Sequence, residues 1–240
     1  MLMHPESVPG PGTRAAPPRL AVARIEQVLT RVPSGYDWMS ESERQRFAAF
    51  GSSRRRDEYR AGHWLLREVV AEVLGGVVAD VLLDDRPGAP PALASTGSGL
   101  SLALSHSQAW VAAGCGRGRI GLDIEQRPRT MAEHIRALLR EADDAEEPDD
   151  DHLLARWAVK EAWIKADLGS ALPETLQALS VRPTADAVAR AWTYSDEAFH
   201  LALVVDSEPL PTARCDASAA ADTRSSWLGW QVRSRGGPDG

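Results

Sequence analysis

Two acidic side chains separated by one residue are the first candidates for chemistry in this sequence. They are Asp123 and Glu125, within the run Gly-Leu-Asp-Ile-Glu. Because side chains alternate along a strand, both carboxylates would project to one face while Leu122 and Ile124 face the core. Neighbouring carboxylates repel each other and resist burial, so a cation is expected between them, and hard oxygen donors favour Mg²⁺ over zinc. The alternative is a solvent-facing pair on an edge strand.

A second candidate is the run from Trp157 to Lys165, which reads Trp-Ala-Val-Lys-Glu-Ala-Trp-Ile-Lys. On a helix, Trp157, Glu161 and Lys165 share one face, which by itself is also typical of a surface Glu–Lys pair. The tryptophan indicates that this face is covered, so Glu161 is a candidate third ligand for Mg²⁺. The remaining ligands of such an ion are usually water and substrate phosphate, and Lys165 would meet the same phosphate.

The third candidate is Ser105-His106-Ser107, which follows a short apolar run. A lone histidine is more often structural than catalytic. Between two hydroxyl groups at the end of a strand, however, His106 becomes a candidate for binding phosphate, because all three side chains can donate hydrogen bonds.

The elements that position these residues follow from periodicity and punctuation. Ser40 and Glu43 form a capping box for a helix to about Phe50, and Gly75-Gly76 ends a longer helix that starts near Ser53. Further helices are expected over 131–139 and 152–167, and strands over 100–104, 110–115, 120–124, 178–181, 191–194 and 199–205. Helices followed by strands, twice over, predict an α+β fold with two similar halves, each a small antiparallel sheet packed with a long helix.

The organisation along the chain follows from these elements. Residues 1–18 are rich in proline and glycine and predict a disordered lead-in. Residues 19–117 are expected to form the N-terminal half, and residues 118–206 the C-terminal half with the metal site. Residues 207–240 are predicted to be a mostly flexible tail, in which the roles of Trp227 and Trp230 stay open.

Composition excludes several classes of function. The net charge of −7 over 240 residues argues against a general nucleic-acid binder, which needs a surface that neutralises phosphates. No apolar run is long enough to span a membrane, and the N-terminus has no signal-peptide pattern, so a cytoplasmic protein is expected. The run 141–151 is almost wholly acidic, and a solvated surface is the simplest interpretation of it.

Taken together, the three motifs resemble the 4′-phosphopantetheinyl transferase family, of the surfactin-synthetase-activating (Sfp-like) type. That family carries Ser-His-Ser, then Gly-x-Asp-x-Glu, then Trp-x-x-Lys-Glu-Ala-x-x-Lys, and this order occurs here at 105–107, 121–125 and 157–165. The likeness extends from about Ile25 to about Val205. It includes a basic helix with Arg56, Tyr59, Arg60 and Arg67, and a basic-residue–proline pair, Arg86-Pro87.

The resemblance implies a monomer that binds coenzyme A (CoA) between two halves and modifies a serine of an acyl or peptidyl carrier protein. It implies that Asp123, Glu125 and Glu161 hold Mg²⁺ on the pyrophosphate, and that Glu161 and Lys165 act in catalysis. Residues expected to contact CoA are Arg56, Arg86, Ser105, His106, Lys160 and Lys165.

Two features depart from the family pattern. The segment after Lys165 is one residue longer than usual, and the acidic run lacks an aromatic pair often found there. Two other functions are weighed against the transferase: a Mg²⁺-dependent nuclease, and a non-catalytic protein that binds CoA or a nucleotide. In the commonest nuclease motif one residue separates the acid from the lysine on a strand, whereas three separate Glu161 from Lys165 here, in a helical pattern. All expected carboxylates are present, so the sequence gives no sign of an inactive form.

Overall fold

The computed structural model describes residues 16–95, 97–142, 144, 146–167, 176–185, 190–206, 212–215 and 227–234. The predicted α+β class is confirmed. Most of the expected lead-in and the lengthened segment after Lys165 lie outside the described residues. The helices are α1 (Ile25–Leu29), α2 (Glu41–Ala48), α3 (Ser53–Leu74), the 3₁₀ turn Val78–Asp80, α4 (Glu133–Leu139) and α5 (Asp150–Ala166). The strands are β1 (Arg19–Arg24), β2 (Leu83–Asp84), β3 (Ala92–Leu93), β4 (Leu100–Ser107), β5 (Trp110–Arg117), β6 (Ile120–Gln126), β7 (Leu179–Thr184), β8 (Ala191–Ser195), β9 (Phe199–Val205), β10 (Thr212–Cys215) and β11 (Leu228–Ser234).

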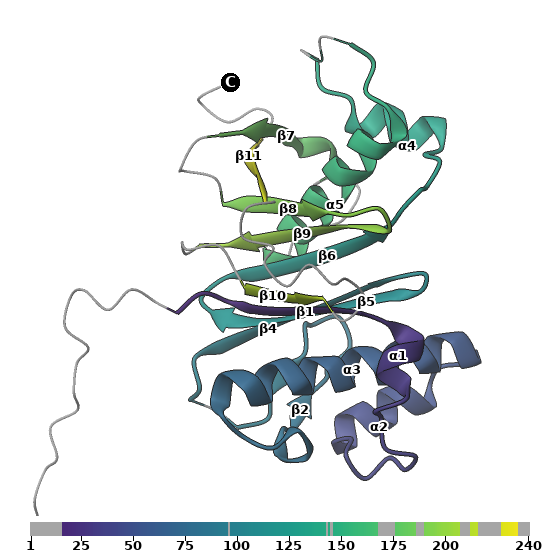
Figure 1. Ribbon diagram of the computed structural model, residues 1–240, viewed down its shortest axis with the longest axis vertical. Coiled ribbons are helices and arrows are strands. Elements are labelled where there is room, and N and C mark those ends of the chain that lie inside the picture. The colour runs from purple at the N-terminus through teal and green to yellow at the C-terminus, as the bar shows by residue number, and fades with distance from the viewer. Residues whose placement is uncertain are drawn as a thin grey trace, which may run out of the picture.

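Two sheets form the centre of the molecule. The first has the strand order β10-β1-β5-β4, and the second has the order β6-β9-β8-β11-β7. Neighbouring strands are antiparallel except for β1 and β10, which are parallel. Helices α1, α2 and α3 lie on the side of the first sheet, whereas α4 and α5 belong to the second (Figure 1). Each sheet therefore has one long helix against it, as expected for two α+β halves.

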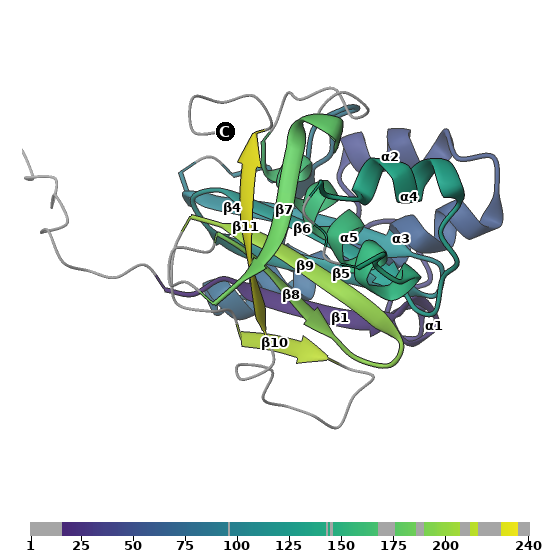
Figure 2. The same ribbon diagram turned by 90° about the horizontal axis from the view of Figure 1, so that it is seen from above.

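The C-terminal segment corrects one expectation. The chain beyond residue 207 was predicted to be mostly flexible, and this is wrong for two segments of it. Strand β10 pairs with β1 in the first sheet, and β11 lies between β8 and β7 in the second. Strands β11 and β7 run side by side in Figure 2. Trp230 on β11 is 1% exposed and donates to Thr193 Oγ1 at 2.8 Å, so this tryptophan belongs to the core.

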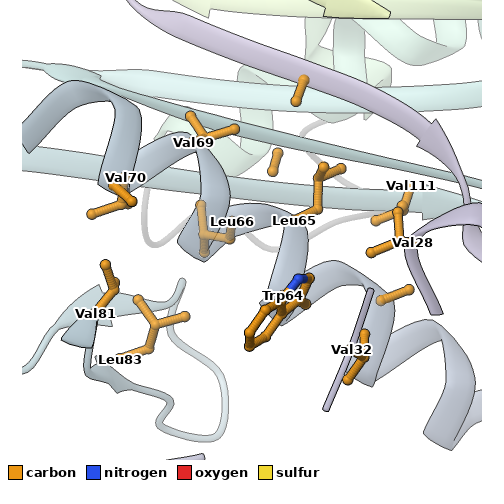
Figure 3. Close-up of a cluster of buried hydrophobic side chains, with 14 of the residues drawn as sticks. Val28, Val32, Trp64, Leu65, Leu66, Val69, Val70, Val81, Leu83 and Val111 are labelled. Carbon is orange, nitrogen blue, oxygen red and sulfur yellow. The ribbon is translucent and has the colours of Figure 1, made fainter. Parts of the chain in front are cut away.

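Helix α3 packs on the face of the first sheet that is turned away from the second sheet, and the side chains between them form the first hydrophobic layer. Ser52 caps its N-terminus by accepting from Arg55 N, and Gly75 ends it in the left-handed conformation at φ 67°, which glycine adopts without strain. Leu65, Leu66 and Val69 are fully or almost fully buried and point into the cluster drawn in Figure 3. Because these residues turn one face of α3 toward the sheet, the packing also sets the direction in which the remaining side chains of α3 point.

Two further apolar layers complete the core. On β1, Leu20 and Val22 face the space between the two sheets, where they meet Leu122 and Ile124 of β6, while the alternate residues of β1 face α3. The third layer lies between α5 and the other face of the second sheet. The order is therefore helix, sheet, sheet, helix, and the strand β6 carries one apolar face and one polar face.

A buried ionic network holds α2 to α3. The predicted capping box is confirmed, because Ser40 Oγ accepts from Glu43 N while the Glu43 carboxylate accepts from Ser40 N. Glu43 is 0% exposed and also accepts from Arg67 Nη1 at 2.8 Å, Arg67 Nη2 at 2.5 Å and His63 Nδ1 at 2.7 Å. Arg67 is equally buried, so this arginine of the basic helix is structural.

The acidic run is largely compensated by arginines. Arg156 donates to both carboxylate oxygens of Asp144, and Arg136 pairs with Asp150 and Glu147. Glu141 is buried and accepts from Val181 N at 3.1 Å. These acidic side chains therefore take part in the contacts around α4 and α5, whereas the sequence suggested only a solvated surface. None of the described helices combines the length and the apolar character that crossing a membrane requires.

Candidate functional site

Asp123 and Glu125 project from the polar face of β6, as the alternation predicted. They are 4% and 8% exposed, so both carboxylates are removed from bulk water. Leu122 and Ile124 point the other way, into the layer between the sheets. The open alternative, a solvent-facing pair, is therefore wrong.

The two serines of the Ser-His-Ser run hold these carboxylates in place. Ser105 Oγ donates to Asp123 Oδ1 at 2.8 Å and accepts from Ile124 N at 3.3 Å. Ser107 Oγ donates to Glu125 Oε2 at 2.8 Å and accepts from Gln126 N at 3.2 Å. Because β4 and β6 belong to different sheets, these hydroxyls bridge the two halves. The sequence resemblance implied that Ser105 contacts CoA, whereas in the structure its hydroxyl donates to Asp123 and positions that carboxylate.

Helix α5 brings Glu161 and Lys165 to the same place. A Cβ atom at Gly121 would lie 2.0 Å from the carbonyl oxygen of Ala162, so α5 lies directly against β6 at this glycine. The close approach explains why Gly-x-Asp-x-Glu needs its glycine. One turn further along α5, Lys165 Nζ lies 2.5 Å from Asp123 Oδ1 and 3.2 Å from Ser105 Oγ.

Burial and mutual repulsion dominate the electrostatics of Glu125 and Glu161, although Lys165 and Arg129 lie close to the group. Burial raises the pKa of Glu161, and the charges of Asp123 and Glu125 raise it further against the opposing effect of Lys165. Burial and Asp123 likewise raise the pKa of Glu125, against hydrogen bonds from Ser107 and Arg129. Burial disfavours the charged form of Lys165, but Asp123 and the other two acids outweigh it and raise the pKa of Lys165.

The chemistry of the donor atoms, though not their arrangement in this structure, suits a hard divalent cation such as Mg²⁺. Asp123 Oδ2 is buried and has no hydrogen-bond partner, so one carboxylate oxygen is left to accept a ligand. Three carboxylates and no histidine or cysteine are the oxygen ligands that Mg²⁺ prefers. Among the described residues, however, no three acidic, histidine or cysteine side chains are arranged so that they could jointly hold a metal ion. In this arrangement the ammonium group of Lys165 provides the positive charge at Asp123.

A pocket with a volume of about 430 Å³ opens beside these residues. Its basic lining residues are Arg46, Arg55, His63, His106 and Lys165. Its apolar lining includes Phe50, Leu102, Leu104, Ile120, Leu122 and Ile164, so α2, α3, β4, β6 and α5 all contribute. A pocket that combines cations with apolar walls, next to buried carboxylates, suits an organic phosphate ester.

Two of the sequence candidates, His106 and Lys165, line this pocket, and Lys165 does so next to Asp123. Arg56 does not belong to the lining; its Nε donates to Phe50 O at 2.9 Å. The guanidinium of Arg86 is exposed and pairs with Asp84 at 2.7 Å, so it too stands outside the lining.

Lys160 is the clearest departure from the sequence-based expectation. Its side chain is 0% exposed, and its ammonium donates to Leu176 O at 3.0 Å with Glu141 at 3.9 Å. A buried ammonium bound to carbonyls inside the C-terminal half does not contact a substrate phosphate, and we assign it a structural role.

Sequence reasoning missed Arg46 and Arg55 as pocket residues. The basic helix singled out from the sequence included Arg56 but not its neighbour Arg55, because consecutive residues on a helix point in different directions and the sequence does not show which one faces the pocket. No local spacing singles out Arg55, because Arg54 at i, i+4 and Arg55 at i, i+3 both pair with Glu58.

Residues 119–215 match the family model of the 4′-phosphopantetheinyl transferase superfamily. The matched segment is less than half of the chain and includes Asp123, Glu125, Glu161 and Lys165, whereas the Ser-His-Ser run precedes it. A search of curated proteins gave no match.

Proposed function

We propose that this protein is a 4′-phosphopantetheinyl transferase of the Sfp-like type, which moves the phosphopantetheine arm of CoA onto a serine of an acyl or peptidyl carrier protein. The observation that carries the proposal is the grouping of Asp123, Glu125, Glu161 and Lys165 at the end of a basic pocket, inside the segment that matches the superfamily model.

The pocket supports CoA as the donor. Arg46, Arg55 and His106 offer hydrogen-bond donors for the phosphates of CoA. The apolar walls provided by Leu104 and Ile164 suit the uncharged parts of the molecule. A volume of about 430 Å³ is within the range of pockets that take small organic ligands.

Asp123, Glu125 and Glu161 would hold Mg²⁺. The ion would neutralise charge on the pyrophosphate and polarise the phosphorus that is attacked. The unpartnered Oδ2 of Asp123 and the raised pKa values of Glu125 and Glu161, caused first by burial, support a cation at this position.

The chain's own residues perform the transfer as follows. Glu161 would accept the hydroxyl proton of the carrier serine, directly or through water. The serine oxygen then forms a bond to the β-phosphorus of CoA, the bond from that phosphorus to the bridging oxygen breaks, and 3′,5′-ADP leaves. Lys165, which lines the pocket, would neutralise the charge that develops on the leaving oxygen.

The decisive experiment is the intact mass of an apo carrier protein after incubation with this protein, CoA and Mg²⁺. We expect a gain of one phosphopantetheine group, which EDTA abolishes. Glu161→Gln should lower kcat by orders of magnitude with the fold intact, because it removes both a metal ligand and the base. Glu133→Gln, at an exposed position on α4, is the matched control and should retain full activity.

No mass gain with fatty-acid, polyketide and peptide-synthetase carriers, despite measurable CoA binding, would contradict the proposal and favour a non-catalytic CoA-binding protein. The choice of carrier, the monomeric state and a cytoplasmic location stay predictions from the sequence.

A further inference from the structure

An acidic side chain is built into the wall of the basic pocket. Glu58 on α3 lines the pocket and is 3% exposed. Its Oε1 accepts from Arg54 Nε at 2.8 Å, and its Oε2 accepts from Arg55 Nη1 at 3.1 Å. A buried carboxylate beside a binding site for polyanions works against binding unless it organises the cations around it. The contacts of Glu58 indicate such a function.

Glu58 also faces His106 through the same oxygen. His106 Nδ1 lies 3.9 Å from Glu58 Oε2, and Arg55 Nη1 lies 3.3 Å from His106 Nε2. A guanidinium can only donate, so the contact with Arg55 requires that Nε2 accepts. The ring proton of neutral His106 is then on Nδ1, on the side of Glu58. One carboxylate therefore fixes the direction of Arg55 and favours one tautomer of His106.

The protonation state of His106 agrees with this geometry. Burial lowers its pKa, and the positive charges of Arg55 and Lys165 act in the same direction. Glu58 and, more weakly, Asp123 oppose them. These effects together favour the neutral imidazole, the state that the contact with Arg55 requires.

We propose that Glu58 is a positioning residue for phosphate binding, which holds Arg55 and the Nδ1–H form of His106 toward the pocket. The inference rests on the proposed function, because it takes the phosphates of CoA as the anions bound. In the Nδ1–H form, His106 Nε2 accepts from Arg55 and helps to keep the guanidinium directed toward the pocket. The alternative is a purely structural role, in which Glu58 only ties down the first turn of α3.

Calorimetric titration of CoA in the presence of Mg²⁺ separates these roles. In Glu58→Gln we expect the dissociation constant for CoA to rise about tenfold, which corresponds to losing one charge-assisted interaction. In transfer assays the loss should fall on KM for CoA and not on kcat. Glu68→Gln is the matched control, because Glu68 lies on the same helix and also pairs with an arginine, Arg31, at 2.9 Å. It should change CoA affinity less than twofold, within the range expected for a site remote from the pocket.

Two readouts identify the mechanism by which Glu58 acts. In a His106→Ala background, Glu58→Gln should weaken CoA binding less than it does alone, because part of its effect passes through the ring. In ¹⁵N-labelled protein without ligand, the Nδ1–H tautomer of His106 should lose population in Glu58→Gln and keep it in Glu68→Gln.

The outcomes distinguish failure of the inference from failure of the proposed function. Unchanged CoA affinity and an unchanged tautomer in Glu58→Gln, with normal binding by the wild-type protein, would overturn the role of Glu58 alone. Absence of CoA binding by the wild-type protein would overturn the proposed function and with it the purpose assigned to Glu58.

Discussion

The ionic network around Glu43 predicts a specific dependence of stability on pH. Hydrogen bonds and charges from His63 and Arg67 outweigh the effect of burial and lower the pKa of Glu43 from 4.5 to about 2. The carboxylate is 0% exposed, so solvent screens these interactions little. At about 1.4 kcal/mol for each pH unit, the ionised carboxylate contributes about 3 kcal/mol to the free energy of unfolding.

The direction of the effect follows from the lowered pKa. Because the folded protein binds the proton less tightly than the unfolded chain, the contribution is complete above about pH 4.5 and is lost as the pH falls toward 2. Glu43→Gln imitates the protonated state and leaves the buried charge of Arg67 without its partner. We therefore expect it to destabilise the protein by about 3 to 5 kcal/mol at pH 7. At pH 3 the difference from the wild-type protein should be smaller by about 2 kcal/mol.

Urea unfolding followed by tryptophan fluorescence, at pH 7, 5, 4 and 3, measures this difference directly. Glu26→Gln, at an exposed position, is the control and should cost less than about 0.5 kcal/mol at every pH. A penalty for Glu43→Gln that stays constant from pH 7 to pH 3 would refute the linkage between this carboxylate and stability. A penalty below about 1 kcal/mol at pH 7 would refute the ionic network itself.

Three further predictions test the placement of the site. Gly121→Ala should lower the melting temperature and abolish CoA binding, because its methyl group would lie 2.0 Å from a backbone carbonyl of α5; Gly76→Ala, with open space around its Cβ position, should do neither. Arg55→Ala should weaken CoA binding about tenfold, while Arg56→Ala leaves it nearly unchanged. Calorimetry that shows the reverse would contradict the role of Arg55 and favour Arg56, the residue that the sequence predicted. Trp230→Ala should cost about 3 to 5 kcal/mol in urea unfolding, since this side chain is 1% exposed, and a cost below about 1 kcal/mol would contradict its place in the core.

The elements that could be predicted are those whose signals are local. The capping box at Ser40 needs only Ser40 and Glu43, and the end of α3 needs only Gly75. Alternation along β6 likewise predicts the common face of Asp123 and Glu125 without knowledge of any other strand. The α+β class follows from the order of such local elements.

The features that were missed depend on partners distant in the sequence. Strand β11 was not predicted, although Leu228, Trp230 and Val232 alternate with glycine or polar residues, because this short pattern stands in a segment rich in Ala, Ser, Arg and Gly. Its partners, β8 and β7, lie far away in the sequence. Lys160 was assigned to the site because a charged residue in a motif is expected to be exposed. The fold instead buries it, with Leu176 O accepting at 3.0 Å. Ser105 was expected to contact CoA. The sequence could not show that its hydroxyl bonds to Asp123 instead, because Asp123 lies on a strand of the other sheet.

A charge balance around the pocket gives a physical reason for a divalent cation in the proposed reaction. Each of three cations that line the pocket is paired with a carboxylate: Arg46 with Asp85 at 3.3 Å, Arg55 with Glu58 at 3.1 Å, and Lys165 with Asp123 at 2.5 Å. The pairs hold the donors in fixed directions, which favours specific binding, but they also cancel most of the positive potential that would attract a polyanion.

Glu125 and Glu161 add further negative charge nearby. A ligand with several phosphate charges therefore needs positive charge from outside the chain, and the unpartnered Oδ2 of Asp123 is a candidate ligand for a cation that would supply it. Because coupling between two ligands is reciprocal, CoA should in turn strengthen the binding of the cation.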